Sequence, residues 1–184
     1  AAHIENRIFR DTIENVHKIK SNFPGQEIAL ITMEAVLEGT LKTDRIQQMV
    51  DAMISEAVAV DTVTGEKGLE NYSAIVLHFL ADFLASLGRM SPGFLAEQIE
   101  RHPGLAKTYR FHIDTWCLEN FYPSIGDSGT FASEAPDCRS LAFNRDVSLA
   151  PSMFSFAWSL YKLTGDADYV RILHRANHRS TDGL

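Results

Sequence analysis

The chain has 184 residues, of which 45% are hydrophobic and 22% are charged, and its formal net charge is -7. This balance is typical of a folded globular protein and excludes a disordered chain. The negative net charge also disfavours general nucleic-acid binding, which needs a dense basic patch. The strongest basic concentration, RILHRANHR near the end, is interpreted as a solvated helix face with Arg171, Arg175 and Arg179.

No run of about 18 apolar residues is present, so the sequence predicts no membrane contact. The chain begins without Met, and its first segment is amphipathic and charged, unlike a signal peptide. We interpret it as a piece of a longer protein. Two cysteines, Cys117 and Cys138, do not define a disulfide framework, and one bridge and two free thiols both remain open.

Helical periodicity dominates the chain from its beginning. Apolar spacing predicts helices over residues 4–20, 26–38 and 43–57, with Gly39 ending the second and Thr43 capping the third. Further helices are predicted over 69–89, 94–101, 105–120, 150–163 and 166–177. Residues 64–68 are predicted to form a loop, and 121–148 a long irregular segment that is packed rather than solvated. The predicted class is all-α, built from helical hairpins.

The tetrapeptide GDSG, residues 126–129, also surrounds the nucleophilic serine of chymotrypsin-like proteases. Those enzymes are β-barrels in which a histidine and a buried aspartate activate the serine, and neither context precedes the tetrapeptide here. The nucleophile elbow G-x-S-x-G does not fit either. By itself, the tetrapeptide indicates a tight turn.

In an all-helical chain, however, the stretch YPSIGDSG resembles the heparinase II/III-like polysaccharide lyases, which carry a similar Pro-x-x-Gly-Asp-Ser-Gly stretch. KIKSNFPGQEIALITMEAVLEG, residues 18–39, is similar to the family segment in which an Asn closes one helix and a Glu opens the next. GEKGLENYSAIVLHFLADFL, residues 65–84, looks like the entry to the helix that bears the catalytic tyrosine. The resemblance implies that residues 1–184 form a single all-helical domain. This domain would be part of an (α/α) toroid, an incomplete barrel, in a longer protein with a β-sandwich domain.

The activity implied is β-elimination of a uronic-acid-containing polysaccharide, such as a glycosaminoglycan or alginate. Asn22 then neutralises the substrate carboxylate through its amide, and Tyr72 acts as acid and base. Phe23 stands where the family has a histidine, so His78 is the candidate replacement. Without the resemblance, Asn22 reads as a turn residue, Tyr72 as a core aromatic in phase with its apolar neighbours, and His78 as a core or groove residue.

Three acidic residues complete the predicted site as substrate-binding or orienting groups: Glu27, Glu70 and Asp127. No cofactor and no metal are predicted, because His174 and His178 lack the glutamate and the third ligand of a zinc motif. The expected partner is an acidic polysaccharide, with self-association through apolar surface that a partial toroid exposes. The resemblance implies a secreted or periplasmic protein.

Two other functions remain open. One is a non-catalytic helical domain that binds carbohydrate or a partner and has lost the lyase residues, as Phe23 suggests. The other is an (α/α) toroid glycoside hydrolase, which would need two carboxylates across a cleft, and no such pair stands out in the sequence.

Overall fold

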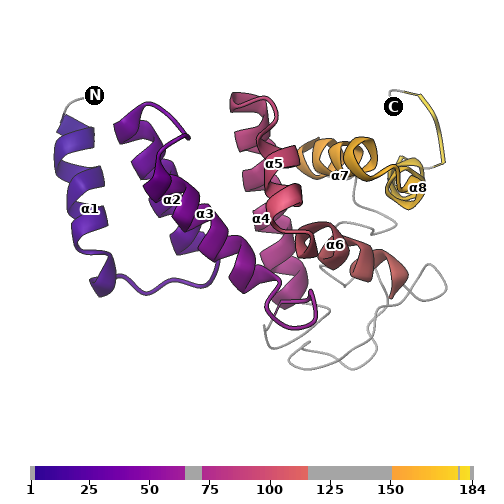
Figure 1. The fold of residues 1–184 in the computed structure, drawn as a ribbon, viewed down its shortest axis with the longest axis horizontal. Helices are drawn as coiled ribbons and strands as arrows, with labels where there is room; N and C mark the ends of the chain where they lie inside the picture. The colour runs from indigo at the N-terminus through magenta and orange to yellow at the C-terminus, as the bar shows by residue number, and fades with distance from the viewer. Residues whose placement is uncertain (1–2, 65–71, 116–150, 178, 183–184) are drawn as a thin grey trace. The chain divides into compact units, whose positions relative to one another are not determined.

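The computed structural model describes residues 3–64, 72–115, 151–177 and 179–182 (Figure 1). Within these ranges the regular structure is helical, apart from one isolated antiparallel bridge between Val60 and Val63. The all-α class is therefore confirmed. The irregular segment predicted over 121–148, which includes GDSG and Cys138, lies outside the described residues, as does Cys117.

The chain divides into two compact units, Ala1–Ser55 and Glu56–Leu184. The first begins with a π-helix, Ile4–Phe9, followed by α1 (Arg10–Glu14) and a 3-10 helix, Val16–Lys18. The single helix predicted over 4–20 is therefore wrong in detail. At the end of α1 the Asp11 carbonyl accepts from both the backbone N–H of Asn15, at 3.0 Å, and its side-chain amide, at 2.9 Å.

The first unit also contains α2 (Gly25–Glu38) and all but the last two residues of α3 (Asp44–Ala57), and both helices begin and end close to the predicted positions. Gly39 ends α2 with a left-handed φ of 66°, which glycine adopts without strain. Thr43 caps α3, since its hydroxyl accepts from the N–H of Ile46 at 3.2 Å. An ion pair of 2.6 Å joins Glu34 on α2 to Arg45 on α3.

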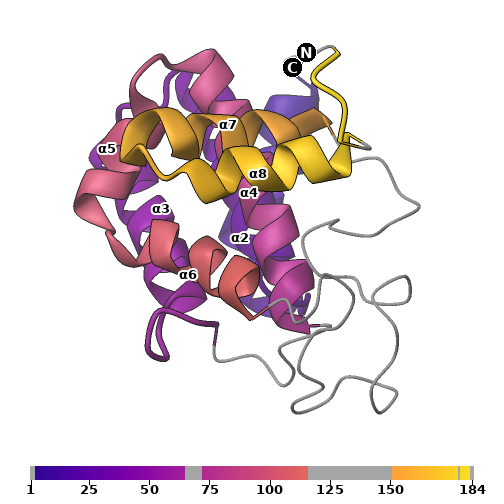
Figure 2. The same cartoon turned by 90° about the vertical axis from the view of Figure 1, so that its right-hand side faces the viewer.

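The second unit contains α4 (Tyr72–Met90), α5 (Phe94–Arg101), α6 (Gly104–Asp114), α7 (Pro151–Thr164) and α8 (Ala167–Ala176). Helix α4 packs on α7, and α7 and α8 lie side by side as a hairpin with a short connection (Figure 2). These bounds agree with the predicted helices except for α6, which ends at Asp114 with Thr115 as its C-cap, whereas the predicted helix continued to residue 120. The predicted residues 69–71 and 116–120 lie outside the described part of the chain. Among the described helices, none is both long and apolar enough to cross a membrane.

The core of the second unit is apolar and includes two phenol groups with satisfied hydrogen bonds. The Tyr109 ring packs 4.7 Å from that of Phe156 between centroids, and its hydroxyl donates to the carbonyl of Leu77 at 2.7 Å. The Tyr169 hydroxyl donates to the carbonyl of Ala106 at 2.9 Å. Burial raises the pKa of both phenols, so each stays neutral and structural.

Two glycines of this unit should respond in opposite ways to alanine. Gly165 joins α7 to α8 at φ 73°, whereas Gly88 lies inside α4, where an added Cβ would be 3.9 Å from that of Leu95. We expect Gly165→Ala to lower the free energy of unfolding by about 1 kcal/mol through backbone strain. Gly88→Ala should raise it by about 0.5–1 kcal/mol through helix propensity. Urea unfolding of both variants tests this, and equal stability of Gly165→Ala and the native chain would contradict it.

Candidate functional site

Asn22 lies in the turn between the 3-10 helix and α2, with its side chain exposed. Its backbone carbonyl accepts from the N–H of Gly25 at 2.9 Å, which ties the turn to the start of α2. Glu27 follows in the first turn of α2 and is half-buried, and its Oε2 atom is enclosed without a hydrogen-bond partner among the described residues. Both candidates therefore belong to the first unit.

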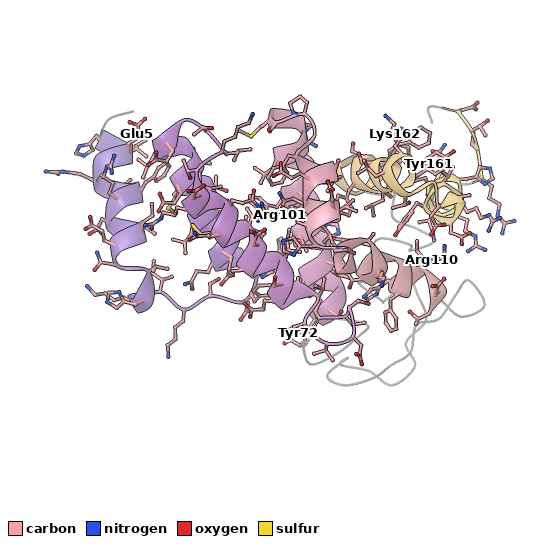
Figure 3. The ribbon with its side chains drawn as sticks, viewed as in Figure 1. Glu5, Tyr72, Arg101, Arg110, Tyr161 and Lys162 are labelled. Carbon is pink, nitrogen blue, oxygen red and sulfur yellow. The ribbon has the colours of Figure 1, made fainter. Side chains whose placement is uncertain are left out.

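Tyr72 is the first residue of α4, and 39% of its surface is exposed (Figure 3). The interpretation as a core aromatic is therefore wrong. It fails because the side of α4 that carries Tyr72 also carries Phe79, which is 51% exposed, whereas the buried side begins with Ser73 and continues through Leu77 and Leu80. Among the tyrosines that the structure describes, Tyr72 alone is exposed, since Tyr161 is half-buried and the other two are core residues.

His78 is half-buried on α4, six residues after Tyr72. On a regular helix that separation amounts to a rise of about 9 Å and a rotation of about 120°. The structure therefore does not bring the two side chains together on one face. Asn22 and Glu27 belong to one unit, and Tyr72 and His78 to the other. Glu70 and Asp127 lie outside the described residues.

His112 on α6 is a buried histidine that the sequence analysis did not select as a candidate. Its Nε2 lies 3.4 Å from the hydroxyl oxygen of Ser73, and Phe111 meets its ring edge-on. Burial lowers the pKa of His112 from 6.5 to about 4, so the ring is neutral near pH 7. The sequence does contain a signal for this burial. His112 has helical spacing with Leu105, Thr108 and Tyr109, so the four residues share one face of α6.

A cluster of charges links α6 to the start of α8. Arg110, on the side of α6 that faces α8, donates from Nη1 to both carboxylate oxygens of Asp166 at 2.8 Å (Figure 3). It also donates to Asp114 at 2.8 Å and pairs with Asp168, which pairs in turn with Arg171. Burial opposes the Arg110 charge, but the hydrogen bonds to Asp166, Asp114 and Asp168 outweigh it and raise the guanidinium pKa.

The same cluster borders a groove of about 490 Å³ between the end of α6 and α8. Two isoleucines line it, together with Asp168, Arg171, His174, Arg175 and Arg179. The arginines predicted as a solvated face thus gather along a hollow. The arginines are visible in the sequence RILHRANHR, but only the fold shows that Arg179, which lies beyond the end of α8, lines the same groove.

A second hollow, of about 280 Å³, lies between α4, α5 and α7. Its apolar floor includes Leu95, and Arg89 and Lys162 are the basic residues of its lining. The Arg89 guanidinium donates to the hydroxyl of Ser86 at 2.9 Å. This hollow is separate from the groove at α8, with which it shares no lining residue.

Among the described residues, no group of three or more His, Cys, Asp or Glu side chains could hold a metal ion. His174 lines the α8 groove, whereas His178 lies outside the described residues. The chain is thus, in its described part, an all-α protein of two compact units with a basic groove at its last helix. Comparison with protein-family models, curated proteins and solved structures finds no significant match in any of the three.

Proposed function

We propose that the chain is the helical part of a heparinase II/III-like polysaccharide lyase that cleaves a uronic-acid-containing polysaccharide by β-elimination. In this proposal the two units contribute to an (α/α) toroid. The observation that supports it most is the exposure of Tyr72, because a tyrosine that exchanges protons with a substrate must be reachable from solvent. The exposed amide of Asn22 is available for the second role that the resemblance assigns.

Asn22 and Tyr72 would have different roles in the reaction. A base removes the proton on the carbon next to the substrate carboxylate, and the freed electron pair forms a carbon–carbon double bond as the 4-O glycosidic bond breaks. The leaving oxygen then takes a proton from an acid. Asn22 would donate N–H bonds to the carboxylate and so stabilise the charge that develops there. Tyr72 would deliver the proton to the leaving oxygen, and its phenolate would serve as the base.

The test is the ultraviolet absorbance of the unsaturated uronate that elimination leaves and hydrolysis does not. The protein is incubated with heparan sulfate, chondroitin sulfate, hyaluronan and alginate in turn. We expect absorbance to rise on one of them, and Asn22→Ala to slow the rise at least tenfold. This is less than the 10²–10³ typical of a donor shielded from water, because Asn22 is exposed.

Asn15→Ala is the matched control. It removes the same kind of side-chain amide from the same unit, but the Asn15 amide is already hydrogen-bonded to Asp11. It should leave the rate within about twofold. Reducing ends released without ultraviolet absorbance would mean hydrolysis and would contradict the proposal.

A second candidate is a non-catalytic helical domain that binds carbohydrate or a partner. The geometry of α4 supports it, because His78 and Tyr72 do not share a face of the helix. Exposed apolar side chains such as Ile8, Phe79 and Met90 offer contact surface for a partner. Binding of one of the four polysaccharides without any elimination would favour this candidate over the lyase.

A further inference from the structure

Arginines of helix α8 and an arginine that follows the helix line the α8 groove. Arg171 and Arg175 are four residues apart on α8, about 6 Å along its axis, and so lie on one face. Arg179 comes after the helix has ended and lines the same groove. It does so with a left-handed φ of 60°, and its N–H donates to the carbonyl of His174 at 2.8 Å. A residue with a Cβ pays about 1 kcal/mol for this conformation.

Hydrogen bonds hold both ends of the groove in place. Asp168 lies between the guanidinium groups of Arg110 and Arg171. Beyond α8, the Asn177 amide donates to the carbonyls of Ser180 at 2.9 Å and Asp182 at 3.0 Å, which fixes the turn that carries Arg179. Contacts on both sides of the groove therefore help to position Arg171 and the backbone of Arg179.

The lining of the groove contains more basic than acidic side chains. Its lining carries three arginines against one carboxylate, and that carboxylate, Asp168, is already shared between two arginines. Burial, and then the nearby charge of Arg179, lower the pKa of Arg175, as expected where cations are gathered. The helix dipole favours cations in the last turn, which accounts for Arg175. It does not account for the backbone conformation that returns Arg179 to the groove.

We propose that this groove is a binding site for a phosphate or sulfate group on a small ligand. Guanidinium groups pair with oxyanions through two parallel N–H bonds, and an esterified phosphate or sulfate offers three oxygens to several such groups at once. A carboxylate offers only two. The volume of about 490 Å³ falls within the range of small-molecule sites.

The proposal is independent of the lyase activity, because its test measures binding alone. Titration calorimetry at low salt uses inorganic phosphate, inorganic sulfate and acetate as probes. We expect phosphate or sulfate to bind at least tenfold more tightly than acetate, and the preferred one of the two identifies the ester that the site takes. Arg175→Gln should weaken that binding at least tenfold, and Arg179→Gln, a change at an exposed position, should weaken it in the same direction.

Arg89→Gln is the matched control, because it removes one arginine charge from the separate hollow at α4. It should change the affinity less than twofold. Asn177→Ala keeps every charge but releases the turn after α8, and it should also weaken binding. Equal affinity for acetate, an equal loss in Arg89→Gln, or no measurable binding of phosphate and sulfate would each overturn the proposal.

Discussion

Lowering the pH from 7 to 4 is expected to reduce the free energy of unfolding by about 3 kcal/mol through His112 alone. In the folded chain the pKa of this histidine is about 4, whereas the unfolded chain has the ordinary value of 6.5. Between these values the unfolded state binds a proton that the folded state does not. The contribution of neutral His112 to the free energy of unfolding is therefore fully present above about pH 6.5 and is lost as the pH falls towards 4.

Urea unfolding at several values between pH 7 and pH 4 measures this loss, and His112→Gln isolates it from the carboxylates that titrate in the same range. Glutamine keeps a polar group beside Ser73 but has no proton to gain. The variant should be less stable than the native chain at pH 7, and its stability should fall by about 3 kcal/mol less on acidification. Parallel pH profiles for the two proteins would show that His112 is accessible to protons in the folded state.

The helices could be predicted because their limits depend on local chemistry. Gly39 supplies the left-handed residue after α2, and the Thr43 hydroxyl caps α3, so each signal acts within a few residues. The helices of the first segment were harder to predict, because Ile4 and Ile8 have helical spacing but remain about half exposed, at 48% and 54%. Apolar spacing indicates a regular helix only where a neighbour buries the apolar face.

The site was less predictable, because it depends on contacts between distant segments. Arg110 meets Asp166 across 56 residues, and no local pattern encodes that pairing. His112 meets Ser73 across 39 residues, which is why its burial in a polar contact became evident only in the fold. For Tyr72 the helical spacing predicted burial, but Phe79 on the same side of α4 is 51% exposed, whereas Ser73 and Leu77 on another side are fully buried. Spacing shows which residues share a side of a helix, and only the fold shows which side its neighbours cover.

Replacing Tyr72 with phenylalanine should lower the rate of elimination by about 10²–10⁴, if the proposed lyase activity is present. The change removes one oxygen and leaves the ring, so the half-exposed packing at the start of α4 is retained. The proton for the leaving oxygen must then come from water, which is a weaker and unpositioned acid. Because a positioned acid acts in the transition state, kcat should fall while KM changes little.

Tyr161→Phe is the matched control, because it removes the same atom from a half-buried tyrosine on α7 whose ring lies 5.6 Å from that of Trp158. A loss confined to Tyr72→Phe, with unchanged stability in both variants, would assign proton transfer to the exposed phenol. Equal rates in the two variants would remove Tyr72 from the chemistry. An increase in KM alone would instead make Tyr72 a substrate contact and leave the acid to be found elsewhere, since burial keeps the phenols of Tyr109 and Tyr169 neutral and bonded to carbonyls.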